Sequence, residues 1–142
     1  MSDAQRIFEL DELQCRQLLA SHKQRLGRIA FAEAGDPNWP SVLPVNYAYH
    51  DGRIYIRTLE GSKLYAALRH QQVAFEIDAV DEQWREGWSV VALGPLELVV
   101  DAAEQATVEP LLRSWVAGGD QRMVRLDIRQ LTGREVVGGP PA

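Results

Sequence analysis

Residues 51–63 read DGRIYIRTLEGSK, and this stretch decides the fold because it joins a hairpin turn, a strand and a polar loop. Asp51-Gly52 is the kind of dipeptide favoured in two-residue β-hairpins, whose central residues take positive φ. Arg53–Thr58 follows as a strand, and a helix is expected from about Lys63 onward. The stretch therefore predicts a hairpin whose second strand leads into a loop at the start of a helix.

The loop has the composition of a phosphate site. Arg57, Thr58, Ser62 and Lys63 supply two cations and two hydroxyls on either side of Gly61. A phosphate monoester needs backbone N–H groups freed by a turn, hydroxyl donors, and cations that neutralise the dianion. A polar turn in which Ser62 caps the helix and both cations face solvent has the same composition, and no Walker loop is present. The residues alone leave both interpretations open.

Composition is that of an ordinary globular domain. The chain has 142 residues, of which 46% are hydrophobic and 25% charged, and these fractions are typical of soluble proteins. We expect a single domain over residues 1–137 and a flexible tail over residues 138–142, whose sequence is GGPPA.

Charge and hydropathy argue against several classes of function. A net charge of −5 argues against nucleic-acid binding, and no apolar run approaches the ~18 residues of a membrane span. The N-terminus lacks a signal-peptide pattern, so a cytoplasmic protein is expected. Cys15 is the single cysteine, and His22, His50 and His70 have no metal-binding spacing, so neither an internal disulfide nor a metal site is expected.

Periodicity along the rest of the chain predicts a mainly β domain. Pro44 cannot donate to a ladder, so it should lie on an edge strand, at a bulge or beside a ligand. Gly94-Pro95 marks a bend in a long strand. About six antiparallel strands with two or three helices indicate a small barrel with helical caps. The expected strands are 27–32, 41–50, 53–58, 73–78, 87–100 and 123–128, and the expected helices are 11–23, 63–70 and 102–117, the last kinked at Pro110.

The order of several short motifs resembles the pyridoxamine 5′-phosphate oxidase-like, flavin-binding split-barrel family. Each motif alone is weak, but the ordered set covers roughly residues 10 to 135 and is typical of that fold. The motifs are Gly27-Arg28-Ile29-Ala30, Pro44-Val45-Asn46-Tyr47, Arg57-Thr58 with Gly61-Ser62-Lys63, Val73–Asp78, Gly87-Trp88-Ser89 and Leu131-Thr132-Gly133-Arg134.

This resemblance implies a fold, a cofactor and an assembly. The fold would be a mainly β (α+β), six-stranded antiparallel split β-barrel with short capping helices. The protein would be a homodimer with FMN at the subunit interface. Arg57, Thr58, Ser62 and Lys63 would hold the phosphate, Pro44, Val45 and Asn46 would run beside the isoalloxazine ring, and Trp88 and Ser89 would face the flavin or its ribityl chain.

The activity expected from the resemblance is a flavin-dependent oxidoreductase acting on a small-molecule substrate. Pyridoxamine-phosphate oxidation itself is less favoured, because no second cluster suits a substrate phosphate. FAD could place a phosphate in the same loop. A deazaflavin-dependent reductase, with Arg53, Arg69 and Arg134 near the cofactor's acidic tail, and a non-catalytic flavin-binding or storage module remain alternatives. No catalytic residue is identified.

One further pair of carboxylates requires an explanation. Glu76 and Asp78 lie two residues apart on the less apolar face of an expected strand. A hydrolase could use such a pair for acid–base chemistry. A structural role, in which Glu76 is paired with Arg57 or Lys63, is the favoured interpretation.

Overall fold

The structure is a computed structural model, which describes residues 6–23, 25–33, 36–66, 68, 72–112 and 120–138, with the side chain of Lys63 outside the description. The expected helix over residues 102–117 and the expected tail are therefore described only in part. Within these residues, no helix is long and apolar enough to cross a membrane.

The described residues form nine strands, all in antiparallel pairs, and short helices. The main path of the sheet runs β3-β2-β6-β7-β8-β5-β4, and β9 joins β1 to β7. The elements are β1 (Arg6–Leu10), α1 (Glu12–Ser21), β2 (Leu26–Glu33), β3 (Asp36–Asn46), β4 (Ala48–His50), β5 (Arg53–Leu59), α2 (Lys63–Ala66), β6 (Gln72–Asp81), β7 (Glu86–Leu98), α3 (Ala102–Val108), the 3-10 turn η1 (Glu109–Leu111), β8 (Gln121–Asp127) and β9 (Gln130–Val137).

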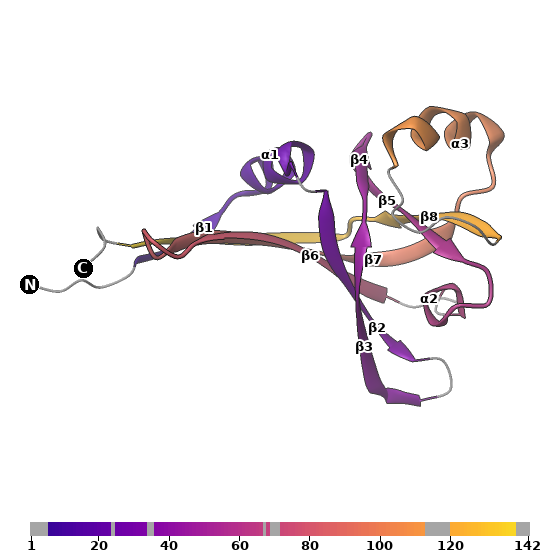
Figure 1. Ribbon diagram of the computed structural model, residues 1–142, viewed down its shortest axis with the longest axis horizontal. Helices are drawn as coiled ribbons and strands as arrows, with labels where there is room; N and C mark the ends of the chain where they lie inside the picture. Colours follow the sequence, from indigo (N-terminus) through magenta and orange to yellow (C-terminus); the bar gives the residue numbers. More distant parts are fainter. Residues whose placement is uncertain are drawn as a thin grey trace, which may run out of the picture.

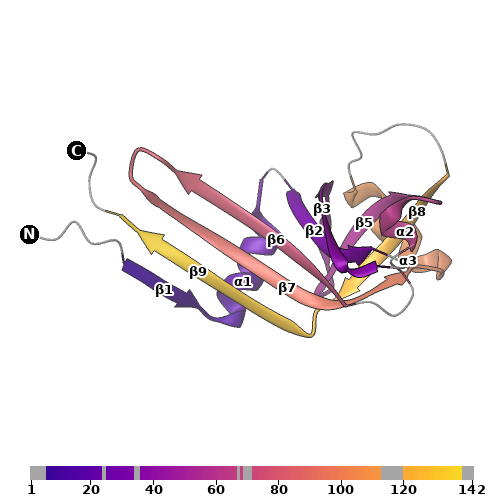
Figure 2. The same cartoon turned by 90° about the horizontal axis from the view of Figure 1, so that it is seen from below.

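The sheet has two parts that share β7. Figures 1 and 2 show β1, β6, β9 and the first part of β7 extending as an arm, while β2 to β5, β8, α2 and α3 gather at the other end. β7 pairs with β6 and β9 over most of its length and then with β8 over Leu96–Leu98. The change of partner follows Gly94, where an added Cβ would collide with the carbonyl oxygen of Asp127. The expected bend at Gly94-Pro95 is where the two parts of the sheet meet.

The antiparallel split-barrel class is confirmed, but the described residues contain more strands than the six expected. β1 and β9 are the strands that the sequence analysis missed, and they pair with each other along the arm. Thr132-Gly133-Arg134 has the composition of a turn, yet it lies inside β9. Gly133 is required there because a Cβ would approach the Sγ of buried Cys15 to 2.7 Å.

The expected strand over residues 41–50 is divided at Tyr47 rather than at Pro44. β3 begins at Asp36, before the expected start at residue 41, and Tyr47 separates it from β4. The Tyr47 N–H donates to the carbonyl oxygen of Arg25 at 3.0 Å, and its hydroxyl donates to that of Leu19 at 2.8 Å. β3 is an edge strand. Pro44 is therefore on an edge, which is one of the places expected for it.

The predicted hairpin turn is confirmed, and α1 begins with a capping box. Asp51 and Gly52 have φ values of 51° and 75°, as the turn between β4 and β5 requires. Asp11 is the N-cap of α1, where it exchanges hydrogen bonds with Gln14 in a capping box. α1 in turn buries Cys15 and Leu19 against the barrel.

Two hydrophobic clusters hold the fold together, one on each face of β5 and β8. The first fills the barrel and includes Ile54 and Ile56 of β5 and Val124 and Leu126 of β8. The second lies under α3 and η1 and includes Tyr55 and Val108. Alternate residues of β5 and β8 therefore face the barrel interior or α3, and this alternation determines where each polar side chain points.

Candidate functional site

The loop that follows β5 turns sharply into α2. Gly61 has a φ of +83°, a conformation that favours glycine. The Ser62 N–H donates to the carbonyl oxygen of Leu59 at 3.1 Å, and the Glu60 N–H donates to that of Asp120 at 2.9 Å. The glycine turn expected from the sequence is present, and the last of these bonds ties the loop to the residue preceding β8.

The two hydroxyls expected at the site lie together. The Oγ1 of Thr58 is 2.8 Å from the Oγ of Ser62, and the Ser62 Oγ accepts a hydrogen bond from the Tyr65 N–H at 3.1 Å. Thr58 is only 7% exposed. If the Thr58 hydroxyl donates to Ser62, the proton of the Ser62 hydroxyl is left to donate to a ligand. Ser62 thus caps α2, as one interpretation holds, and can still serve as a donor.

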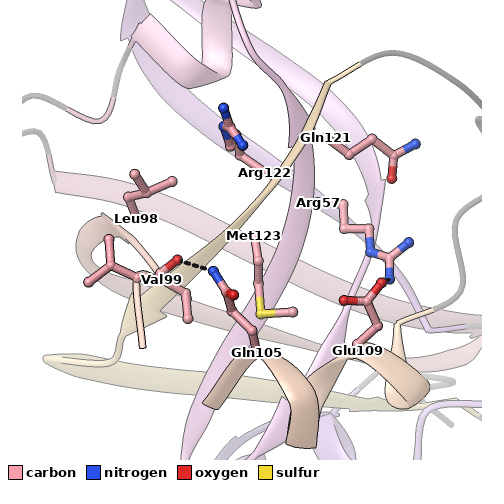
Figure 3. Close-up of a pocket in the computed structure, with 9 residues that line it drawn as sticks. Arg57, Leu98, Val99, Gln105, Glu109, Gln121, Arg122 and Met123 are labelled. Carbon is pink, nitrogen blue, oxygen red and sulfur yellow. Dashed lines mark hydrogen bonds and ion pairs between the residues drawn. The ribbon is translucent and has the colours of Figure 1, made fainter. Parts of the chain in front are cut away.

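Arg57 lies on the other face of β5. Its Nη2 is 2.7 Å from the Oε1 of Glu109 in η1, and it lines a cavity of about 460 Å³ beside α3 (Figure 3). The structure therefore does not bring Arg57 together with Thr58 and Ser62. Lys63 is the first residue of α2, directly after Ser62, but the description does not include its side chain.

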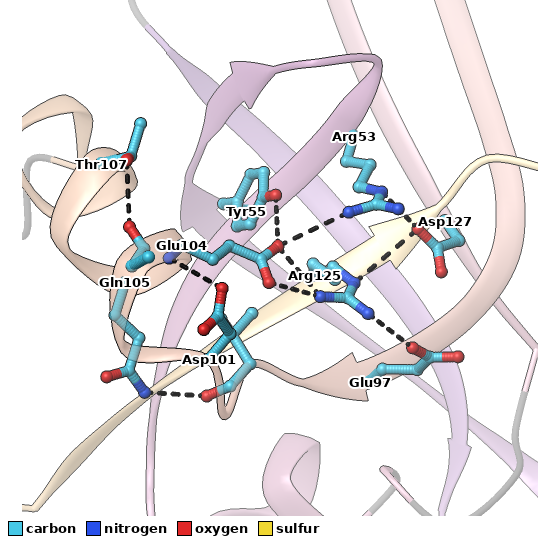
Figure 4. Close-up of polar contacts among 11 residues, drawn as sticks. Arg53, Tyr55, Glu97, Asp101, Glu104, Gln105, Thr107, Arg125 and Asp127 are labelled. Carbon is cyan, nitrogen blue, oxygen red and sulfur yellow. Dashed lines mark hydrogen bonds and ion pairs between the residues drawn. The ribbon is translucent and has the colours of Figure 1, made fainter.

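The α3 face of β5 and β8 also carries an ion-pair network centred on Glu104 (Figure 4). Arg125 donates to both carboxylate oxygens of Glu104 at 2.7 and 2.9 Å, and the Tyr55 hydroxyl donates to one of them at 2.6 Å. Burial alone would raise the pKa of Glu104, but the hydrogen bonds from Tyr55 and Arg125 outweigh it and lower that pKa. Arg53 belongs to the same network, through Asp127 at 3.0 Å. The network anchors α3 on the sheet.

Pro44, Val45 and Asn46 form the end of β3, on the edge of the sheet. Val45 packs against the barrel core. β3 and β5 are far apart along the path of the sheet, yet they contact each other, and α2 contacts both β2 and β5. The sheet therefore curls until its β3 edge meets β5 without pairing with it. The end of β3 and the loop after β5 belong to this split side of the barrel.

Trp88 and Ser89 lie away from that loop. Ser89 pairs with Asp78, which lies six positions along β6 from Gln72, at the end of β6 nearest α2. At about 3.3 Å per residue this is about 20 Å. Trp88 faces the interior, where its ring meets that of His22 edge-on at 5.5 Å, while Ser89 faces the outer side. One chain thus brings Thr58 and Ser62 together but leaves Trp88 and Ser89 on the arm.

The carboxylates Glu76 and Asp78 pair with Arg28 and not with Arg57, which pairs with Glu109, while the side chain of Lys63 lies outside the described part of the chain. Arg28 Nη1 is 3.0 Å from Glu76 and 3.1 Å from Asp78. This correction follows from the pairing of β2 with β6, which places Arg28 directly opposite Glu76. Burial, followed by the neighbouring Asp78, raises the pKa of Glu76, and Arg28 opposes that shift. The cluster lies on the outer face of the sheet.

The outer face of the arm is open and partly apolar. A cavity of about 650 Å³ lies between β1, the β6–β7 hairpin and β9, and Ser89 and Arg134 line it. Ile7 and Val80, which also line it, are 66% and 74% exposed. Arg53 lies on β5 and Arg134 on β9, two strands that do not pair with each other, and Arg69 lies outside the described residues. Among the described residues, no group of three His, Cys, Asp or Glu side chains is placed to hold a metal ion.

The fold and its loop define a split β-barrel of the type found in pyridoxamine 5′-phosphate oxidase-like proteins. The chain belongs to the pyridoxamine 5′-phosphate oxidase family, whose model matches residues 11–135. An uncharacterized protein of Mycobacterium tuberculosis is 34% identical over 139 residues, which cover 94% of this chain and 88% of that protein.

Two solved structures show the same fold. A FAD-binding protein from Mycobacterium smegmatis superposes with a TM-score of 0.75 at 32% identity, covering 90% of this chain and 98% of that one. A FAD-binding protein from Mesorhizobium loti superposes with a TM-score of 0.74 at 27% identity, covering 91% of this chain and 97% of that one.

Proposed function

We propose that this protein binds a flavin nucleotide, through the phosphate that FMN and FAD share, and uses it in the oxidation or reduction of a small molecule. The observation that carries the proposal is the loop after β5. There a glycine turn, a buried threonine hydroxyl and a capping serine converge beside the split of the barrel. Family membership and the two FAD-binding relatives support the same ligand class.

The residues present suit such a ligand. Ser62 and Thr58 offer hydroxyls, Lys63 follows them at the first position of α2, and Gly61 lets the backbone approach a phosphate closely. Val45 and Asn46 give the β3 edge an apolar surface and an amide, which match a ring that has an apolar body and a polar edge. When bound, the flavin supplies the redox chemistry, and the chain supplies position and electrostatics.

We further propose that the complete site needs a second copy of the chain. Ser89 pairs with Asp78, about 20 Å along β6 from Gln72, the end of that strand nearest α2, so on this proposal Trp88 and Ser89 contact the flavin held by the loop of the other chain. The open outer face of the arm, with exposed Ile7 and Val80, offers apolar surface for such an assembly. Light scattering of the purified protein should give the mass of a homodimer. A monomer that retains flavin would contradict this arrangement.

The first test is the visible absorption spectrum of the purified protein, repeated after incubation with FMN or FAD and desalting. Retained flavin bands support the proposal, and the mass of the released flavin separates FMN from FAD. Ser62→Ala should weaken the binding of flavin by roughly tenfold or more, because a hydrogen bond to a charged group contributes about 1.5–3 kcal/mol.

A matched control for this variant lies on β3. Ser41 donates a hydrogen bond to Glu33 at 3.2 Å, so its hydroxyl is already engaged on the β2–β3 hairpin, and Ser41→Ala should leave the affinity for flavin unchanged. Equal flavin affinities for the wild type, Ser62→Ala and Ser41→Ala would contradict the phosphate site. A protein that binds flavin but oxidises NADH or NADPH no faster than free flavin would be a binding module and not an enzyme.

A further inference from the structure

The pairing of β5 with β8 places a second arginine on the face that carries Thr58. Thr58 lies directly opposite Arg122 in the register, and directly opposite residues point to the same face, with Cβ atoms about 4.5–5.5 Å apart. Two residues further along β8, Val124 is buried in the barrel core. The backbone register therefore starts Arg122 on the barrel face of β8 and Arg57 on the α3 face of β5, although the side chain of Arg122 also lines the rim of the cavity beside α3.

Figure 3 shows how the two guanidinium groups diverge. Arg57 points toward Glu109 and η1, and Arg122 points away from them. The Nη2 of Arg122 lies 2.9 Å from the Oε2 of Glu60, which is two residues before Ser62. Both side chains of this pair are close to half exposed. Arg122 therefore already reaches the loop that carries the two hydroxyls.

We propose that Arg122, and not Arg57, is the arginine that contacts the flavin phosphate. The inference rests on the flavin site proposed above. An ion pair between half-exposed side chains contributes little. A phosphate dianion at Ser62 therefore competes with Glu60 for the guanidinium and gains a charge-assisted contact, for which the planar guanidinium has bidentate geometry. In the free protein, Glu60 holds the guanidinium beside the loop. Arg57 cannot reach Ser62 from the α3 face without leaving Glu109.

The test compares FMN with riboflavin, which has the same ring system but no phosphate. Both are titrated into the full chain, and the quenching of flavin fluorescence is followed. Arg122→Ala should weaken FMN binding by tenfold or more and leave the riboflavin affinity within twofold. Arg57→Ala is the matched control, since it removes an arginine from the paired strand, and it should change neither affinity by more than twofold.

The possible outcomes separate this inference from the proposed function. Wild-type protein that binds neither FMN nor FAD would refute both. Wild-type protein that binds FMN, with an Arg122→Ala variant that binds it equally well, would refute only the role of Arg122. An equal loss of FMN and riboflavin affinity in that variant would show a structural effect and refute the contact.

Glu60→Gln distinguishes a direct contact from simple neutralisation of Glu60. Freed from its carboxylate partner, Arg122 should bind FMN at least as tightly as in the wild type. The double variant Arg122→Ala/Glu60→Gln should remain weak, because the contact itself is missing. Wild-type affinity in the double variant would mean that Arg122 only cancels the charge of Glu60, and the proposed contact would be wrong.

Discussion

The Glu104 network makes a quantitative prediction about stability. Glu104→Gln keeps the size of the side chain and removes the charge that faces Arg125. The Glu104 and Arg125 side chains are 16% and 20% exposed, so their paired hydrogen bonds are better shielded from water than a surface pair. Hydrogen bonds to charged groups contribute about 1.5–3 kcal/mol. Because Glu97 still accepts a hydrogen bond from Arg125 at 3.1 Å, we expect Glu104→Gln to lower the free energy of unfolding by about 2 kcal/mol.

A loss of about 2 kcal/mol should lower the midpoint of thermal unfolding by roughly 6 °C in a chain of this length. Urea unfolding followed by tryptophan fluorescence gives the free energy directly. Glu109→Gln is the control, because it breaks the pair between Arg57 and a carboxylate that is 64% exposed. That pair should contribute less than about 1 kcal/mol.

The effect should also depend on pH in a defined direction. Because the pKa of Glu104 is lower in the folded protein than its ordinary value of 4.5, its charge stabilises the fold fully above pH 4.5, and this stabilisation disappears as the pH falls through the folded-state pKa. The difference between wild type and Glu104→Gln should be constant near neutrality and shrink in acid. A variant within about 0.5 kcal/mol of wild type, or a difference independent of pH, would refute this account of the network.

Substitutions at three further positions test the backbone and the capping of α1. Gly61→Ala should lower the free energy of unfolding by about 1–2 kcal/mol, because φ is +83° there, which urea unfolding measures. It should also weaken flavin binding, which a flavin titration measures. Gly94→Ala should lower the free energy of unfolding by about 3 kcal/mol or prevent folding, because the added Cβ would meet the backbone of Asp127. A urea midpoint equal to that of the wild type would contradict the close approach at the bend in β7. Asp11→Ala removes the capping box and should lower the free energy of unfolding by about 1 kcal/mol. Asp11→Asn should retain most of that stability when both variants are compared by thermal unfolding.

Local chemistry explains which parts of the fold could be predicted from the sequence. The Asp51-Gly52 turn and the Asp11 cap each depend on a few neighbouring residues, so the sequence specifies them directly. β1 and β9 could not be found this way. β1 is short and its side chains are mostly exposed, and β9 contains Gly133 for the sake of Cys15, a residue more than 100 positions away. A strand stabilised by distant partners carries little periodicity of its own.

The candidate site shows the same division. The glycine turn and the two hydroxyls lie within five residues, so their association was predicted correctly. The positions of the arginines depend on the pairing of β5 with β8, strands separated by more than 60 residues. Arg57 immediately precedes Thr58 in the sequence, but alternation along the strand turns it to the opposite face. Arg122 is distant in sequence and lies opposite Thr58.

A shift of one residue in this register would move every side chain of β8 to the other face of the sheet, with Arg125 in the core and Val124 under α3. The burial of Val124 and Leu126 in the barrel and the fit of Arg125 to Glu104 both exclude that shift. The same contacts therefore fix Arg122 opposite Thr58. On this argument, the packing of α3 and of the barrel core determines which arginine lies opposite Thr58. A mutation in the Glu104 network should consequently weaken flavin binding only when it also loosens β8.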